Sequence, residues 1–215
     1  MKQLNFRNIS ALSPLVLALV CMGLANPVRA ECMPQAKAQC EGAKLDRVDW
    51  RNAQLEGGDF RNANFKHADL TGANLKGADL RGANLQFARL QRVNLTDANL
   101  EGADLRWANM ERSTLVRARF VNAQLAKADL EDADISGAVL SGADLTRTDL
   151  INTDLQQADL SQTRLDGAYL NYANLKQANL SGSSIQRARF TGARLSKATW
   201  TDGKVCRAPS MGKCN

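Results

Sequence analysis

Histidine and aromatic residues are scarce in this chain. Its 215 residues include one histidine, His67, and aromatic side chains make up only 5% of them. One imidazole cannot supply a site that needs several, so most histidine-based catalytic arrangements and histidine-rich metal centres are excluded. The length leaves room for one domain or two small ones.

Proline and cysteine are missing from the long central stretch, residues 43–202. All four prolines and all five cysteines lie outside it. Proline would delete a backbone donor, so its absence is compatible with a continuous ladder of main-chain hydrogen bonds. The absence of cysteine confines any disulfide to the two ends of the chain.

The first thirty residues have the pattern of a secretory signal peptide. Lys2 and Arg7 give a positive start, residues 9–25 are apolar with one proline, and residues 28–30, Val-Arg-Ala, offer a cleavage site before Glu31. An uncleaved membrane anchor is the alternative, but the apolar stretch is short for a span of about 20 residues. We therefore expect export to the periplasm, a thylakoid lumen or the extracellular space, with no membrane span after cleavage.

Charge does not indicate a nucleic-acid partner once the signal is removed. The full chain has 28 Lys and Arg and 22 Asp and Glu, a formal charge of +6. Cleavage after Ala30 removes three basic residues and no acidic one, which leaves 25 against 22, or +3. This near balance gives no reason to expect nucleic-acid binding.

A five-residue repeat runs through residues 43–202. It begins AKLDR, VDWRN, AQLEG and ends with ATWTD, which gives 32 units without insertion or deletion. The third residue of each unit, here called the centre, is Leu in 23 units and large and apolar in the other nine. The first residue is Ala in 24 units and is small or β-branched elsewhere. Two apolar positions therefore recur every five residues.

Neither standard periodicity accommodates this spacing. Five residues on an α-helix advance about 500°, so the centres would spread around the cylinder instead of forming a stripe. On a flat strand, successive centres would face opposite sides. Both apolar positions can point inward if the chain turns in the same sense after each unit, and this predicts a solenoid.

The other positions agree with a turn after each unit. The second residue is Asp or Asn in 19 of the 32 units, and such side chains bond nearby backbone N–H groups at turns. The fifth residue is Gly in 10 units, which suits a backbone corner.

These features resemble the pentapeptide-repeat family, whose signature is A(D/N)LXX. The resemblance covers residues 43–202, about three quarters of the chain, in unbroken register. It implies an all-β fold, a right-handed quadrilateral β-helix with four units in each coil. About eight coils at roughly 4.8 Å would form a rod of about 38 Å.

The ends of such a rod need caps, because a solenoid leaves an apolar coil exposed there. We assign residues 31–42 to an N-terminal cap with one or two turns of helix starting at Pro34. Residues 203–215 form a loop-like C-terminal cap. The caps hold the four cysteines of the mature chain: Cys32, Cys40, Cys206 and Cys214.

Four cysteines permit three sets of pairings. Two of these sets would join one cap to the other along the whole rod, whereas a disulfide needs Cα atoms within about 7 Å. Within one molecule, Cys32–Cys40 and Cys206–Cys214 remain, and an oxidising compartment favours both. A metal site shared by the caps fails on the same distance and lacks a nearby histidine.

The sequence contains no catalytic constellation. Eleven of the 22 acidic residues occupy the second position of a unit, where the turn already explains them. Serine and threonine are scattered over outward positions, with His67 as the sole imidazole base. We therefore expect no enzyme, no cofactor and no bound metal.

Outward aromatic residues indicate a contact surface. Phe87 and Trp107 occupy fifth positions, where the core does not require them, and a 20-residue coil would stack them among cations. Trp and Arg favour interfaces, although two exposed rings can also merely cover a corner. We name the following set the ridge and predict that it binds a partner: Lys66, His67, Phe87, Arg106, Trp107, Lys127 and Arg147.

Two other features stay open. The coil of residues 105–124 departs most from the repeat and adds Arg112, Arg117 and Arg119, which suits either an anionic surface or a coil that has drifted. Tyr169 and Tyr172 are the remaining outward aromatic residues.

Two classes of function compete. The first is an exported, non-catalytic binding or scaffold protein with an unidentified protein partner in the envelope or a lumen. The second resembles the quinolone-resistance branch of the family, DNA-mimicking topoisomerase inhibitors, which look like acidic cytoplasmic rods that often carry loops inserted between coils. The signal peptide, the charge of +3 and the unbroken register favour the first.

Overall fold

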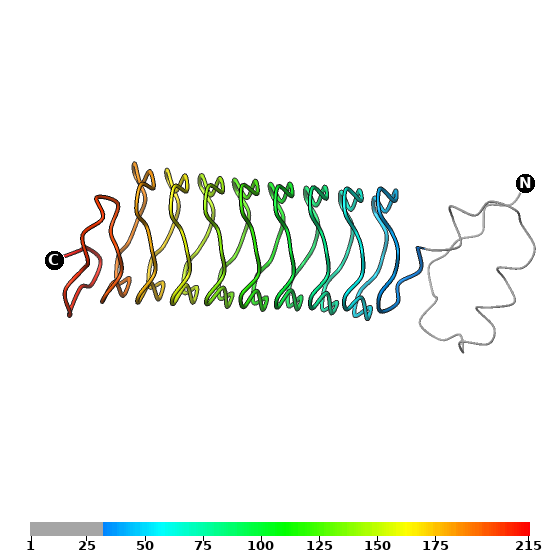
Figure 1. The fold of residues 1–215 in the computed structure, drawn as a ribbon, viewed down its shortest axis with the longest axis horizontal. Helices are drawn as coiled ribbons and strands as arrows, with labels where there is room; N and C mark the ends of the chain where they lie inside the picture. Colours follow the sequence, from blue (N-terminus) through cyan, green and yellow to red (C-terminus); the bar gives the residue numbers. More distant parts are fainter. Residues whose placement is uncertain (1–31) are drawn as a thin grey trace, which may run out of the picture.

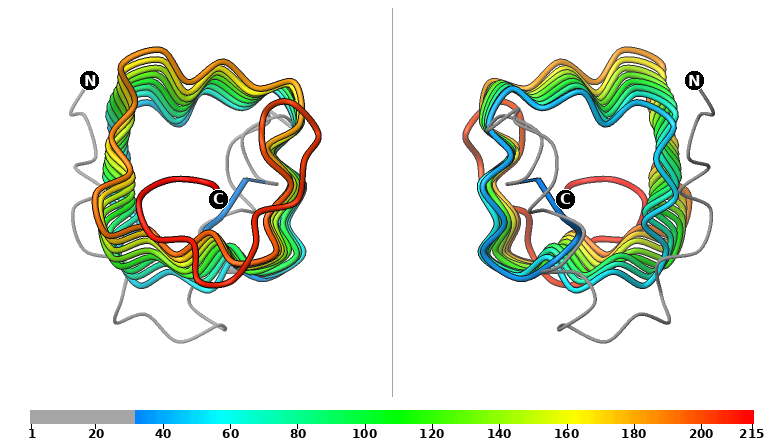
Figure 2. Two further views of the ribbon diagram at one scale, coloured as in Figure 1. Left: turned by 90° about the vertical axis from the view of Figure 1, so that its left-hand side faces the viewer. Right: turned by 90° about the vertical axis from the view of Figure 1, so that its right-hand side faces the viewer.

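The computed structural model describes residues 32–215, which form a rod with a four-sided cross-section (Figures 1 and 2). The predicted signal peptide, residues 1–30, and its cleavage site lie outside the described residues. Residues 32–215 contain no helix, and their β-pairing consists of isolated bridges. The parallel bridges run from Gln39↔Asp59 to Asn179↔Thr199, and each joins residues twenty apart. One turn of the rod therefore takes twenty residues, or four units.

Each corner is a turn closed by the backbone. The N–H of a first residue donates to the carbonyl of the preceding centre, as Ala68 does to Phe65 at 2.9 Å. The fifth residue of every unit from Lys37 to Lys197 has a positive φ. Glycine adopts this left-handed conformation without strain, which explains the glycines at this position.

Asp and Asn at the second position complete the turn. Their Oδ1 atom accepts the backbone N–H two residues on, as Asn84 does from Gln86 at 3.1 Å. This bond forms in 18 of the 19 units with Asp or Asn there. The predicted role of these side chains at the turn is confirmed.

Main-chain hydrogen bonds join neighbouring coils. The N–H of a centre donates to a second-position carbonyl in the next coil, as Leu105 does to Gln124 at 2.7 Å. The N–H of Gln124 in turn donates to Ala103 at 2.9 Å. A proline at either place would break the ladder, which explains why none occurs in the repeats.

First residues and centres fill the interior as predicted. Nearly all of the Leu centres and Ala first residues are fully buried. Five of the six aromatic centres lie near the two ends of the rod, where Trp50, Phe60 and Phe65 pack edge to face, as do Phe190 and Trp200. A Cβ atom at Gly58 would collide with the ring of Phe60, so the large centre explains the one glycine at a first position.

The predicted helix at the N-terminal cap is wrong. Residues 34–37 form a bend and a turn, and the register of the repeats already holds at Ala38 and Cys40, which are buried at first and centre positions. The N–H of Cys40 donates to the carbonyl of Asp59 at 2.7 Å. Because Ala-Gln-Cys keeps the repeat's apolar spacing, this segment gains more from joining the coil than from an isolated helical turn.

The C-terminal cap is paired rather than a simple loop. It folds back on the last coil through two antiparallel bridges, Thr199↔Val205 and Arg194↔Met211. Both predicted disulfides are present, with Cα–Cα distances of 4.8 Å for Cys32–Cys40 and 4.9 Å for Cys206–Cys214.

Candidate functional site

The ridge contains a continuous stack of rings on one corner of the rod. His67 and Phe87 lie 5.0 Å apart between ring centroids at an interplanar angle of 15°. Phe87 and Trp107 follow at 6.2 Å and 9°. The coil's twenty-residue turn creates this stack, since the three residues occupy the fifth position in successive coils.

Two lysines extend the stack. Lys127 Nζ lies 4.1 Å from the Trp107 ring centroid, and Lys66 Nζ lies 5.8 Å from that of Phe87. Both distances are within the range of cation–π attraction. Arg147 continues the column but contacts no ring within residues 32–215; its Cγ lies close to Gly167 instead.

Arg106 is held by an acid of its own unit. Its Nε donates to Asp104 Oδ1 at 2.9 Å and its Nη2 to Oδ2 at 2.6 Å. Burial alone would raise the pKa of Asp104, but hydrogen bonds from Arg106 and Gln86 outweigh it and lower that pKa. Arg106 therefore has its charge balanced locally, and the cations of the ridge without an ion pair in residues 32–215 are Lys66, Lys127 and Arg147.

A shallow hollow opens between the two largest rings. Gln86, Phe87, Arg106 and Trp107 line it. Gln86 was left out of the predicted site although it precedes Phe87; its amide bonds Asp104 Oδ2 at 2.6 Å and so supports Arg106. The sequence signal for Gln86 was its position one coil before Arg106, which cannot be seen when the units are considered one at a time.

The core does not require these exposed rings. Phe87 is 42% exposed and Trp107 50%, and both have positive φ values, 58° and 63°. Glycine fills this position in ten of the 32 units and would relax the backbone. The turn therefore explains neither aromatic residue.

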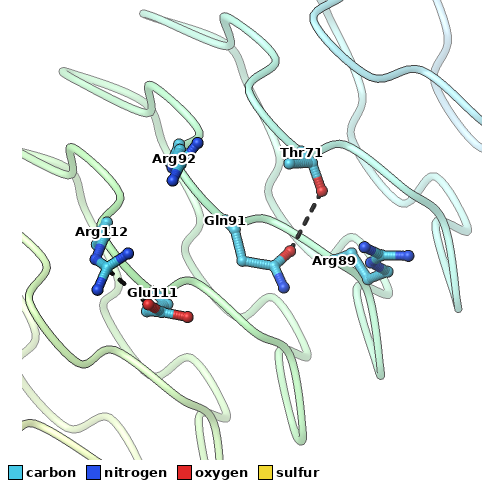
Figure 3. A pocket seen from close by; sticks show the side chains of 6 residues that line it. All are labelled: Thr71, Arg89, Gln91, Arg92, Glu111 and Arg112. Carbon is cyan, nitrogen blue, oxygen red and sulfur yellow. Dashed lines mark hydrogen bonds and ion pairs between the residues drawn. The ribbon is translucent and has the colours of Figure 1, made fainter.

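A second hollow, on the next corner, was not predicted (Figure 3). Arg89 lies 3.4 Å from Asp69, and Arg112 lies 3.4 Å from both Glu111 and Asp132. Arg92 has no ion pair among the residues of the described rod. The lining residues are Thr71, Arg89, Gln91, Arg92, Glu111 and Arg112. The twenty-residue spacing of these polar residues in the sequence was the signal from which this hollow could have been predicted.

The arginines of the coil 105–124 are only partly free. Arg117 makes a two-pronged ion pair with Asp97 of the preceding coil, at 2.7 and 2.9 Å. This pair lowers the pKa of Asp97 and raises that of Arg117. The coil therefore offers less unpaired charge to an anionic surface than its composition indicates.

Other kinds of site have little support within residues 32–215. This part of the chain brings no three His, Cys, Asp or Glu side chains together as metal ligands. None of its segments forms a helix long and apolar enough to cross a membrane.

Comparisons with known proteins agree on one kind of repeat. A family model described as pentapeptide repeats (8 copies) matches residues 36–72, 59–97, 94–137, 128–167 and 158–196. No curated protein matches the chain.

Solved structures supply several similar chains. HetL, a pentapeptide repeat protein involved in heterocyst differentiation regulation in the cyanobacterium Nostoc sp. strain PCC 7120, is 31% identical; the match covers 79% of this chain and 81% of HetL, with a TM-score of 0.40. Rfr23 from the cyanobacterium Cyanothece 51142 is 28% identical over 51% of this chain and 89% of its own, with a TM-score of 0.50. QnrB1, a plasmid-mediated fluoroquinolone resistance protein, is 22% identical over 80% and 85%, with a TM-score of 0.48.

Proposed function

This chain belongs to the pentapeptide-repeat family, and from that premise we propose that it is an exported binding or scaffold protein that holds a protein partner against its ridge. Members of the family are generally non-enzymatic structural and binding proteins, so the activity is not catalytic. We take the coil to be right-handed, as in the family to which it belongs, and to make about eight turns, since 160 residues repeat at twenty per turn.

The stack of His67, Phe87 and Trp107 is the observation that carries this proposal. Large half-exposed rings on a rigid frame lose little conformational entropy when a partner covers them. Lys66 and Lys127 at the edges of the stack have no ion pair in the described rod and can meet acidic groups on the partner. Aromatic side chains surrounded by polar residues are typical of the positions that dominate binding energy at interfaces.

Export is supported by two separate features of the chain. The first thirty residues carry the signal-peptide pattern, and all four cysteines outside that segment are paired. Disulfides persist in oxidising compartments such as the periplasm, a lumen or the extracellular space.

The competing function, DNA mimicry against a topoisomerase, lacks support from charge. A DNA mimic must present an acidic surface, whereas residues 32–215 contain 25 Lys and Arg and 21 Asp and Glu. We therefore do not favour it.

A capture experiment with a paired control tests the proposal. The mature protein is immobilised, exposed to an envelope fraction, and its bound proteins are identified by mass spectrometry. Phe87→Ala with Trp107→Ala should weaken binding of the specific partner at least tenfold, because it removes both large rings. Tyr172→Ala, which removes a ring that is 62% exposed on another corner, should leave binding unchanged. Equal binding by the double variant would place the contact elsewhere.

A further inference from the structure

The hydrogen-bond ladder stops halfway round the last coil. In the coil before it, Leu165 and Gly167 donate their N–H groups to Ser184 and Gln186 at 2.7 and 2.8 Å. In the last coil, the N–H groups of Ile185, Arg187, Phe190 and Gly192 have no hydrogen-bond partner within residues 32–215. The carbonyls of Ser183 and Ala188 likewise accept no hydrogen bond there.

The folded-back tail covers the other half of this coil and also touches the end of this half, where Gly212 lies against the backbone of Phe190 and Gly192. Leu195 and Lys197 donate to Ser210 and Cys206, each at 2.9 Å. In Figure 2 (left), the red C-terminal segment lies against part of the square outline and leaves the rest of the orange coil uncovered. We call the backbone of residues 183–192 the open edge. An unpaired edge of this kind is a template for strand addition.

Positive charge is concentrated in residues 185–215, although one acid of the preceding coil, Asp166, also lies at the open edge and accepts the N–H of Gln186 at 2.8 Å. Residues 185–215 contain seven Lys and Arg against one acid, Asp202, which pairs with Lys204 at 2.8 Å. Residues 32–184 contain 18 against 20. Arg187 and Arg189 are exposed beside the edge without an ion pair in the described chain, and Arg189 lies 5.2 Å from the Tyr169 ring. The charge therefore favours an acidic occupant.

The interior at this end can take further apolar side chains. Ile185 and Ala188 are only partly buried although they occupy centre and first positions. In the middle of the rod, residues at these positions are covered by the next coil. An extended segment with apolar residues at the same spacing would bury them.

A second copy of the chain cannot fill the edge by continuing the coil. If the second copy continued the coil with its residue 44 paired to Ser184, that residue would stand at place 204 of the coil, because ladder partners are twenty residues apart. Residues 38–42 of the second copy, which already follow the repeat, would then occupy the space of residues 198–202 of the first. The two caps therefore block end-to-end stacking.

We propose that the open edge binds an extended acidic segment of a partner protein, which adds two further sides to the coil by strand addition. The segment's second-position N–H groups donate to Ser183 and Ala188. Its carbonyls accept from Ile185, Arg187, Phe190 and Gly192, and its acidic side chains face Arg187 and Arg189.

A peptide taken from the chain's own repeat serves as the probe. Residues 128–137, ADLEDADISG, span two units and carry four acids. Fluorescence anisotropy compares this labelled peptide with a neutral version, ANLQNANISG, and with an acidic version N-methylated at the two second positions. We expect both modified peptides to bind at least tenfold more weakly, since one lacks charge and the other lacks the two donors.

Variants of the protein and hydrogen exchange locate the peptide. Arg187→Gln with Arg189→Gln should weaken binding of the acidic peptide at least tenfold. Arg47→Gln with Arg119→Gln, which makes an equal charge change elsewhere, should not weaken it. Exchange of the amides of residues 185, 187, 190 and 192 should slow when the peptide binds.

Five results would overturn the proposal. The acidic peptide fails to bind at millimolar concentration, or protects only the N-terminal coil. The N-methylated peptide binds as well as the parent, which would mean that charge alone is responsible. The neutral peptide binds as well as the acidic one. The four amides become protected when the protein alone is concentrated, which would identify a second copy as the occupant.

Discussion

The fifth residue of each unit up to Lys197 holds a left-handed backbone conformation that most L-amino acids avoid. In three units this residue is an asparagine, Asn52, Asn62 or Asn122. Its side-chain amide lies over a glycine of the next coil, where a Cβ atom would collide with the amide. In the ridge, the same position carries Phe87 and Trp107 instead. Residues that the turn does not need are therefore open to selection for binding.

Replacing a ridge residue should affect stability much less than replacing a centre. Leu105→Ala should lower the free energy of unfolding by about 2–5 kcal/mol, because its side chain is fully buried and leaves a cavity. Trp107→Ala should change it by at most about 1 kcal/mol, since half of the ring is in solvent. Denaturant unfolding of both variants measures the difference. Equal losses would show that the ridge belongs to the folding core.

Removing a turn carboxamide should have a small, measurable effect. Asn99 Oδ1 accepts the N–H of Glu101 at 3.1 Å, so Asn99→Ala should destabilise by about 1 kcal/mol. Gln124 occupies the same position in another unit, makes no such bond and is exposed, so Gln124→Ala is the matched control and should be near neutral. If both variants unfold alike, the second-position side chain does not support the turn.

At the scale of the coil, ion pairs on one corner make stability depend on pH. Hydrogen bonds from Arg81 hold the pKa of Asp79 below its usual range, and Arg61 does the same for Asp59. Because the folded-state pKa is lowered, the stabilisation is complete above the unfolded value of about 3.9 and is lost as pH falls through the folded value.

The free energy of unfolding should therefore fall on acidification below about pH 4. Arg81→Gln should flatten this dependence, because the pKa of Asp79 returns towards its ordinary value. Lys176→Gln, which removes a cation without an ion pair in the described residues, should leave the curve unchanged. Urea titrations at several pH values give the comparison, and an unchanged slope in Arg81→Gln would refute the assignment.

The caps should be the least stable elements once their disulfides are removed. Cys206→Ser with Cys214→Ser opens a loop of roughly ten residues and should cost up to about 3 kcal/mol. Amides of Leu195 and Lys197, which donate to the tail, should then exchange faster than those of Leu105. Non-reducing peptide mapping of the native protein should show both local pairs, and a Cys40–Cys206 linkage within one molecule would contradict the stacked coil.

Across the whole molecule, the repeat made the fold predictable because one five-residue rule decides burial, turn and pairing together. The ridge stack followed from the same rule once a coil was taken as twenty residues. The N-terminal segment was misjudged because Cys40 stands where Leu was expected. The ion pair of Arg106 with Asp104 depends on side-chain conformation, and the pairing of the tail depends on residues that do not repeat, so periodicity predicted neither.

Export is the widest claim about the molecule and has a direct chemical signature. Protein recovered from the periplasm or lumen should start at Glu31, and its intact mass should lack residues 1–30. Full-length protein confined to the cytoplasm would remove the reason for the disulfides as well as the proposed compartment.

Photo-crosslinking in living cells tests the central claim, that the ridge holds a partner. A benzophenone amino acid is placed at position 87 in the ridge or at position 157, a fifth position on another corner. If the ridge binds the partner, irradiation should give one discrete cross-linked product from position 87 and none from position 157. Products from position 157 alone, or the same products from both, would contradict it.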